Sequence, residues 1–416
     1  MPDYTIQSVT TYDARFALPP GAGTDSIHAT SEYCLATTLL STQNGLRGTG
    51  FVLTLGDGNT LVCKAIEMLA KPIEGMSIET VMADFGNISR KIADHAALRW
   101  LGPHKGVMQL ALASITNACF DLWAKSRGVP LWKLLLDLTP EELVRVLDLS
   151  YLEEILSKEK ALSMLREHLP SRCQREAILK SGYPGYDTSV GWMGYSDDKV
   201  TELTKKALDQ GFSAFKLKVG SPDESRDLRR AAMVRKLIGE ESTLMFDANQ
   251  HWHLPDALRI CQELAQYRPY WIEEPTHPDD IQAHVKLSRA VSPIKIAAGE
   301  HIANRVLFKN FMQVEALSFI QVDCTRVAGV SEFLTVSFLA EIFDLPVVPH
   351  VGDMGQMHQH LVLFNHIGLG LKAEFLEHIP HLRTHFLHPA HVTDGVYRTP
   401  QEPGASTDLK VLTSSY

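Results

Sequence analysis

Four hydrophobic segments of this 416-residue chain each end on a carboxylate, and a fifth ends on a histidine. The segments LMFDAN, WIEEP, KIAAGE, FIQVD and LPVVPH carry Asp247, Glu273, Glu300, Asp323 and His350, which lie 26, 27, 23 and 27 residues apart. One strand, a crossover helix and two loops need about that many residues. Parallel strands that end in charged groups at one rim are how a barrel of alternating strands and helices builds an active site. The spacing therefore predicts an α/β barrel with its functional groups at one rim.

The other strand candidates agree with this barrel. In order they are YDTSVGW, AFKLKV, TLMFDA, YWIEE, IKIAAG, FIQVD, PVVPH and KAEFLEH, with helical patterns between most of them. Eight strands favour a barrel over a doubly wound sheet, which is the alternative and would need a Gly-rich fingerprint after its first strand. We predict an α+β domain over residues 1–138, a helical connector over 139–185, the barrel over 186–380, and a C-terminal segment, 381–416, that packs back on the first domain.

Composition excludes several classes of function. The net charge of −9 gives no reason to expect nucleic acid or an anionic membrane as a partner. The six cysteines show no CxxC pair and no metal-binding spacing, which is typical of reduced thiols. The opening residues lack the basic start and apolar core of a signal peptide, and no stretch reaches the roughly 18 uninterrupted apolar residues of a membrane helix. These features predict a cytoplasmic protein.

Three of the strand-end carboxylates form a candidate metal site. Asp247, Glu273 and Glu300 would repel one another on neighbouring strands unless a cation lay between them. Hard oxygen ligands without cysteine suit Mg²⁺. In the IEEP segment Glu273 and Glu274 are both candidates, and because successive strand residues alternate in direction only one of them faces the metal.

Two further pairs are candidates for proton transfer. Lys216 and Lys218 are two apart on one strand, so both face into the barrel, where burial and mutual repulsion should lower their pKa values toward neutrality. Asp323 and His350 lie one strand unit apart, and a carboxylate beside an imidazole fixes its tautomer and raises its basicity. These pairs predict a base on one side of the barrel and an acid/base on the other.

Nine of the eighteen histidines lie between His350 and His391, which invites a zinc-site interpretation. Prolines interrupt any common helical face in EFLEHIPHLRTHFLHPAH. We interpret this run as surface and capping histidines.

The motifs KLKVG, FDANQ, WIEEP, AAGEH and the Asp323–His350 pair, in this order, resemble the enolase superfamily and its mandelate racemase subgroup, in the branch of L-fuconate and L-galactonate dehydratases. The resemblance implies a (β/α)₇β barrel, a modified TIM barrel, under an α+β capping domain, with Mg²⁺ as cofactor and a homo-oligomer as assembly. It assigns the metal ligands to Asp247, Glu273 and Glu300 and places Glu274 behind them. It assigns the base to Lys218 with Lys216 assisting, the opposing pair to His350 and Asp323, and contact with the substrate carboxylate to Glu374.

The chain departs from the pattern of this branch in segments that determine specificity. GTDSIHA stands where relatives have a DAMN run, and VGDMGQMHQHL replaces a longer Gly-rich stretch after His350. CTRVAG replaces a CRLGG-like run, and TLGDGN places the acidic Asp57 where relatives have a cation. If Asp57 faces the pocket, it should disfavour a second substrate carboxylate and favour a neutral polyol end. L-fuconate itself does not follow as the substrate.

The residues and the resemblance together predict Mg²⁺-dependent dehydration of a small sugar acid, an L-fuconate-like aldonate, to a 2-keto-3-deoxy sugar acid. Lys218 removes the C2 proton to give an enediolate, and His350 helps to expel the C3 hydroxyl. A racemase or epimerase with the same residues is the alternative, in which His350 returns the proton. A cycloisomerase is disfavoured because VDCTRVAGV has no lysine after the sixth strand. A non-catalytic binding barrel would have lost a ligand or base, and none is lost.

Overall fold

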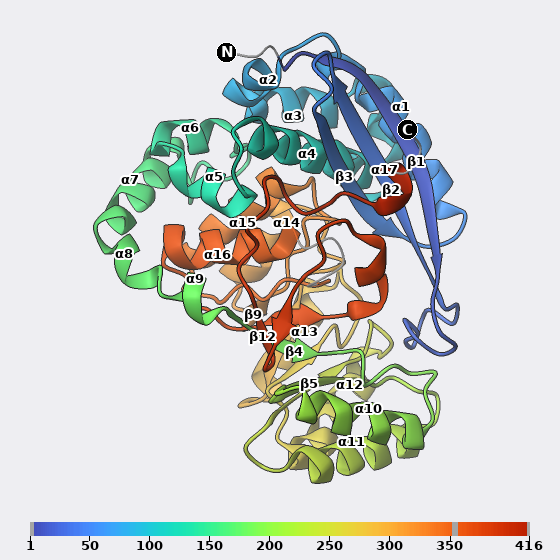
Figure 1. Ribbon diagram of the computed structural model, residues 1–416. Coiled ribbons are helices and arrows are strands. Elements are labelled where there is room, and N and C mark those ends of the chain that lie inside the picture. Colours follow the sequence, from blue (N-terminus) through green and yellow to red (C-terminus); the bar gives the residue numbers. More distant parts are fainter. Residues whose placement is uncertain (1–3, 352–356, 414–416) are drawn as a thin grey trace.

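The fold joins an antiparallel sheet to a parallel sheet that is wound with helices (Figure 1). The computed structural model describes residues 4–351 and 357–413. The antiparallel sheet is a meander of β1 (Ile6–Ala17), β2 (Glu32–Thr42) and β3 (Arg47–Thr54).

Helix α4 (Gly106–Ser126) lies directly against the backbone of β3. The contact depends on Gly50, because a Cβ at this position would lie 2.2 Å from both Ala118 N and Ser114 O. Of the helices in the described ranges, α4 alone is long and apolar enough to cross a membrane, and 89% of its most apolar window is buried inside the protein. The apolar surface of α4 therefore belongs to the core.

Shorter helices complete this half of the molecule. We call β1–β3 and α1–α4 the capping region. Its other helices are α1 (Gly58–Leu69), α2 (Ile78–Ala83) and α3 (Phe85–Ala93), with 3-10 turns at Lys71–Ile73 and Ala96–Leu101. The next segment forms an arc of α5 (Leu131–Asp137), α6 (Pro140–Arg145), α7 (Lys158–His168), α8 (Arg172–Arg175) and α9 (Ile178–Ser181), with a 3-10 turn at Leu169–Ser171 (Figure 1).

The parallel sheet follows chain order, as the spacing predicts. Its strands are β4 (Tyr183–Asp187), β5 (Ala214–Lys218), β6 (Thr243–Asp247), β7 (Trp271–Glu273), β8 (Lys295–Ala298) and β9 (Phe319–Ile320), with β10 (Leu376–His378) on the other side of β4. The helices between them are α10 (Asp197–Asp209), α11 (Glu224–Ile238), α12 (Leu254–Leu264), α13 (Ile281–Ala290), α14 (Arg305–Gln313), α15 (Val330–Ile342) and α16 (Met357–Leu369), and a 3-10 turn follows α12 at Ala265–Tyr267.

The seventh strand position is taken by a short segment that begins at Val347. Val347 forms one parallel bridge with Ile320 of β9, and Val351 N donates to the Glu377 carboxylate of β10 at 2.8 Å. One buried cluster contains a residue from each of the seven consecutive parallel segments: Tyr186, Ala214, Met245, Trp271, Ala297, Phe319 and Val348. Side chains therefore fill the space that the strands enclose, and the predicted TIM-barrel-like fold with a capping region is confirmed.

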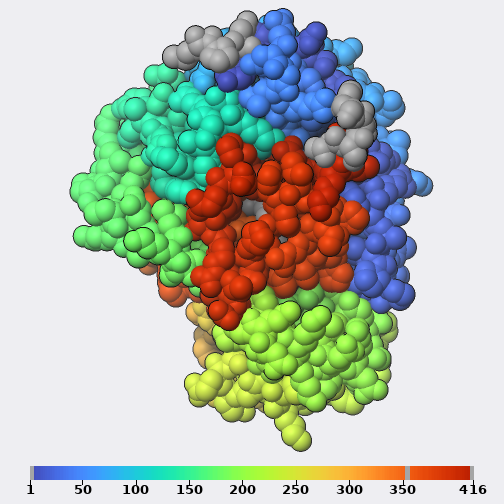
Figure 2. Space-filling view, viewed as in Figure 1, coloured from blue at the N-terminus to red at the C-terminus, as the bar shows by residue number. Residues whose placement is uncertain are grey.

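The C-terminal segment returns to the capping region. A hairpin of β11 (Val392–Thr393) and β12 (Val396–Tyr397) extends the sheet beside β4, after a 3-10 turn at Pro380–His385, and α17 (Lys410–Thr413) ends the described chain. Asp121 of α4 accepts from Ala405 N at 2.7 Å, and Lys125 donates to Asp408 at 2.7 Å. In Figure 2 the red C-terminal residues lie between the blue capping region and the green first barrel elements. The four residue ranges proposed for the domains stay a prediction.

The interpretation of EFLEHIPHLRTHFLHPAH as surface and capping histidines is wrong for His378, which is buried because β10 lies inside the sheet. His358 and His360, which precede this run, are also buried, because α16 packs against the core on most of its sides. His360 accepts from Trp132 N at 3.2 Å, and burial lowers its pKa to about 3.

Acidification should destabilise the fold through His360. Its imidazole stays neutral in the folded state but takes up a proton near pH 6.5 in the unfolded state. Stability is therefore lost as the pH falls from about 6.5 toward the folded pKa. Between pH 7 and 5.5 the loss should be about 1 kcal/mol. His360→Asn keeps an acceptor for Trp132 N but does not titrate. The melting temperature of this variant should therefore fall less between pH 7 and 5.5 than that of the wild-type protein. Equal falls in both proteins would contradict the assignment.

Candidate active site

The predicted carboxylates converge at the carboxyl ends of the parallel strands. Asp247 ends β6, Glu273 ends β7, and Glu300 lies just beyond β8. Each is buried, and carboxylate oxygens of the three lie within 4.8 Å of one another. In the sheet, Lys218 pairs with Asp247 and Asp247 pairs with Glu273, so the ends of β5, β6 and β7 lie at one level.

This cluster fits a divalent cation. Three buried carboxylates in mutual contact offer hard oxygen ligands, and burial together with the Asp247 charge raises the pKa of Glu273. Glu274 is directed elsewhere: its φ is +43°, and its carboxylate accepts from Gln250 and from His301, whose Nδ1 lies 2.9 Å away. Of the two adjacent glutamates, Glu273 therefore faces the cluster.

The two lysines of β5 occupy different environments. Lys216 is fully buried, and its Nζ lies 2.7 Å from Glu273, 2.8 Å from Glu377 and 3.5 Å from Asp247. Lys218 lines a cavity and donates to Asp247 at 2.6 Å and to Asn249 at 3.0 Å. Lys216 therefore neutralises carboxylates, whereas Lys218 faces the space where a ligand would bind.

The expected lowering of the lysine pKa values is wrong for this arrangement. Burial does act to lower the pKa of Lys218, but the charges of Asp247, Asp25 and Glu300 together offset it and hold this pKa above its usual value. Glu273 and Glu377 do the same for Lys216. Two neighbouring lysines lower each other's pKa, but here the carboxylates of the adjacent strands outweigh that repulsion.

His350 and Asp323 form the predicted pair. His350 Nδ1 lies 2.8 Å from Asp323 Oδ2, and His350 Nε2 lies 3.1 Å from Glu300 Oε2. Burial acts to lower the pKa of His350, but Glu300 and Asp323 raise it above its ordinary value. The imidazole thus lies between its carboxylate support and the candidate metal cluster.

The structure does not bring Glu374 to this site. Glu374 precedes β10, at the amino ends of the strands, where it accepts from Tyr270 OH at 3.0 Å and pairs with Lys372. Glu377 instead lines the cavity at the other rim, because it is three residues further along the strand direction. Applied to KAEFLEH, the rule that a carboxylate closes the apolar run selects Glu377, so the signal was present in the sequence.

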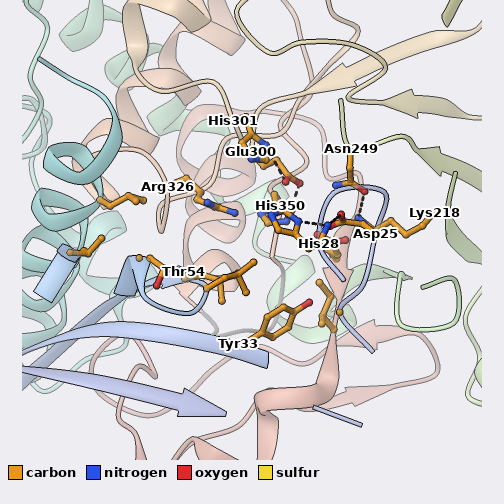
Figure 3. A pocket seen from close by; sticks show the side chains of 18 of the residues that line it. Asp25, His28, Tyr33, Thr54, Lys218, Asn249, Glu300, His301, Arg326 and His350 are labelled. Atoms are coloured by element: carbon orange, nitrogen blue, oxygen red, sulfur yellow. Dashed lines mark hydrogen bonds and ion pairs between the residues drawn. The ribbon is translucent and has the colours of Figure 1, made fainter. Parts of the chain in front are cut away.

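A cavity of about 290 Å³ lies between the capping region and the barrel rim (Figure 3). From the barrel side Lys218, Asn249, Glu300, His301 and His350 reach it. Asp25 and His28 reach it from the loop between β1 and β2, joined by a contact of 2.9 Å. The capping region adds an apolar wall of Leu53, Leu55, Leu61, Val62, Val107 and Leu110.

Asp57 does not meet the condition set for it, because it precedes α1 and does not line the cavity. A cation lines it instead. Arg326, which follows Asp323 by one turn, extends into the cavity (Figure 3). Among the described residues, no carboxylate pairs with Arg326, and its buried Nε has no hydrogen-bond partner.

Four lining residues are not among those that the sequence predicts: Arg326, Asp25, His28 and His301. Asp25, His28 and Arg326 lie in runs that depart from the branch pattern, which was the available signal.

Comparisons with known proteins give a consistent result. A family model described as enolase C-terminal domain-like matches residues 199–412. The chain is 40% identical over 415 residues to mitochondrial enolase superfamily member 1 of Homo sapiens, which covers 97% of this chain and 94% of that protein. The crystal structure of the human protein matches with a TM-score of 0.95 at 39% identity, covering 99% of this chain and 95% of that one.

Two named dehydratases are also similar. L-galactonate dehydratase of Hypocrea jecorina is 39% identical over 419 residues, covering 99% of this chain and 93% of that protein. L-talarate/galactarate dehydratase from Salmonella typhimurium LT2, whose crystal structure is liganded with Mg and L-lyxarohydroxamate, matches with a TM-score of 0.76 at 25% identity, covering 98% of this chain and 91% of that one.

Removal of a cluster carboxylate should weaken binding of a divalent cation. Asp247→Asn and Glu273→Gln each withdraw one hard anionic ligand, and we expect Mn²⁺ affinity, measured by calorimetry, to fall by about tenfold or more. Glu374→Gln is the matched control, since it changes a buried carboxylate at the opposite rim. Wild-type affinity in Asp247→Asn would exclude this cluster as the metal site.

Proposed function

The chain belongs to the enolase superfamily, and from this premise we propose that it is a Mg²⁺-dependent dehydratase of a sugar acid. The observation that carries the proposal is the cavity in which Lys218 and His350 both adjoin three buried carboxylates. The similarity to two named dehydratases favours dehydration over racemisation. The product would be a 2-keto-3-deoxy sugar acid.

Asp247, Glu273 and Glu300 would hold the cation. When bound, Mg²⁺ supplies positive charge that stabilises negative charge on the carboxylate end of the substrate. Lys216 offsets the charge of Glu273 and Glu377 behind the cluster, at 2.7 and 2.8 Å. The carboxylate end of the acid would therefore bind at this rim, beside Glu377.

Proton transfer is divided between two side chains. Lys218, oriented by Asp247 and Asn249, removes the C2 proton after it has released to solvent the proton that the neighbouring carboxylates favour on its amine. His350, oriented by Asp323, donates a proton from Nε2 to the C3 hydroxyl as the C3–O bond breaks and water leaves. The enol that remains takes up a proton at C3 and loses the proton of its C2 hydroxyl, which gives the 2-keto acid, so the reaction consumes one substrate and releases one water.

The apolar wall of the cavity is the feature that favours an aldonate, such as an L-fuconate-like acid, whereas the Arg326 cation alone would also accept a second carboxylate. The apolar wall would pack against the last carbons of the chain. Arg326 would donate to the hydroxyl oxygens between this wall and C3. Asp57 plays no part in this selection, because it lies outside the cavity.

The direct test is a screen of aldonic and aldaric acids with Mg²⁺, in which 2-keto-3-deoxy products are detected by semicarbazone absorbance and confirmed by NMR. We expect dehydration of at least one aldonate, and loss of that activity in excess chelator. Turnover in chelator, or racemisation without loss of water, would refute the proposal.

Variants of the two proton-transfer residues should separate the steps. Lys218→Ala should abolish both dehydration and exchange of the C2 hydrogen with deuterated solvent, because no base remains near C2. His350→Asn should lower the rate of dehydration by about a hundredfold or more, while exchange of the C2 hydrogen continues. NMR of recovered substrate measures exchange. Wild-type exchange in Lys218→Ala would show that another group is the base.

Arg326→Met should raise KM for a six-carbon aldonate by about tenfold while kcat changes less, because the lost hydrogen bonds lie away from C2 and C3. Asp57→Asn is the matched control and should leave both constants within about twofold. A larger effect of Asp57→Asn than of Arg326→Met would reverse this assignment.

A further inference from the structure

A second histidine lies behind the His350–Asp323 pair. His358 of α16 is fully buried, and its Nε2 lies 2.9 Å from Asp323 Oδ1. The other oxygen of the same carboxylate, Oδ2, lies 2.8 Å from His350 Nδ1. Asp323 therefore joins two imidazoles, of which only His350 lines the cavity. His358 lies in the run VGDMGQMHQHL, one of the segments in which the chain departs from the branch pattern.

The surroundings of His358 fix its position. Cys324 N–H points at its Nε2 over 3.3 Å, Cys324 Sγ lies at the same distance from Nε2, and the Phe333 ring meets the imidazole edge-on at 6.3 Å between centroids. Its buried Nδ1 has no hydrogen-bond partner among the described residues. Asp323 Oδ1 can only accept, and its 2.9 Å contact is shorter than the 3.3 Å approach of Cys324 N–H, so the neutral tautomer carries its proton on Nε2 and donates it to Asp323.

The same geometry argues against a metal site at Asp323, Cys324 and His358, whose donor atoms lie within 4.8 Å of one another. Asp323 Oδ1 already accepts from Thr325 N at 2.7 Å and from Thr325 Oγ1 at 2.8 Å, and Oδ2 is occupied by His350. The Cys324 thiol is buried, which raises its pKa and disfavours the thiolate that a metal would need.

We propose that His358 is a positioning residue for the elimination step, which holds the Asp323 carboxylate so that His350 Nε2 is aimed at the leaving hydroxyl. A carboxylate held only by the histidine it supports can turn with that histidine. With Oδ1 fixed by His358 and Thr325, the direction of the Oδ2 lone pair is set, and the His350 ring follows it. The inference rests on the proposed dehydration, in which His350 expels the C3 hydroxyl.

The test compares two rates in the Mg²⁺-loaded enzyme. One is dehydration of an aldonate that the wild-type enzyme accepts, and the other is deuterium exchange at C2 in the recovered substrate, which needs Lys218 but not His350. His358→Leu should lower dehydration by about tenfold or more and leave exchange within about threefold. His358→Gln, whose side-chain NH₂ can donate to Asp323 from the place of Nε2, should recover most of the dehydration.

His360→Leu is the matched control, because His360 is a fully buried histidine on the same helix whose contacts are to Trp132 and Ser406. It should destabilise the protein without changing the ratio of the two rates. Equal losses of both rates in His358→Leu, or no loss of either, would overturn the positioning role. If the wild-type enzyme neither dehydrates nor exchanges any acid sugar, the proposed function itself fails, and this inference falls with it.

Discussion

The repulsion among buried carboxylates at one barrel rim is the constraint on which the rest of the site depends. Asp247, Glu273, Glu300 and Glu377 are all buried, and so many anions in a low dielectric are tolerated only beside cations. Lys216 lies against three of the four, within 3.5 Å. A divalent cation between Asp247, Glu273 and Glu300 would complete this compensation. The lysines of β5 are thus part of the charge balance of the site as well as of its chemistry.

Much of the fold and the centre of the site could be predicted, because they follow from local rules. A strand, a helix and two loops repeat at a nearly fixed length, so Asp247, Glu273 and Asp323 could be placed at one rim from their intervals alone. Lys216 and Lys218 follow from alternation along β5. The carboxylates, lysines and His350 come together as predicted, although their individual roles stay predictions.

The errors concern quantities that depend on neighbours distant in sequence. The direction of the Lys218 pKa shift depends on several carboxylates, of which Asp247 on the next strand, 29 residues away, contributes most. The resemblance assigns Glu374, whereas the end of β10 places Glu377 in the cavity. Asp57 lies in a loop, whose direction the sequence alone does not determine. The burial of His358 and His360 depends on the packing of α16 against the core, which the histidine-rich composition of the run does not disclose.

The hydrogen bonds that orient the two proton-transfer groups come from different parts of the chain. Lys218 is held by Asp247 and Asn249 at the end of β6, whereas His350 is held by Asp323, which follows β9. In the proposed mechanism, a substrate in the cavity between them would meet a base and an acid whose hydrogen-bond supports share no residue. We therefore expect that each support can be altered while the other stays in place. Such independence would allow one scaffold to combine proton removal at C2 either with loss of a neighbouring hydroxyl or with return of the proton.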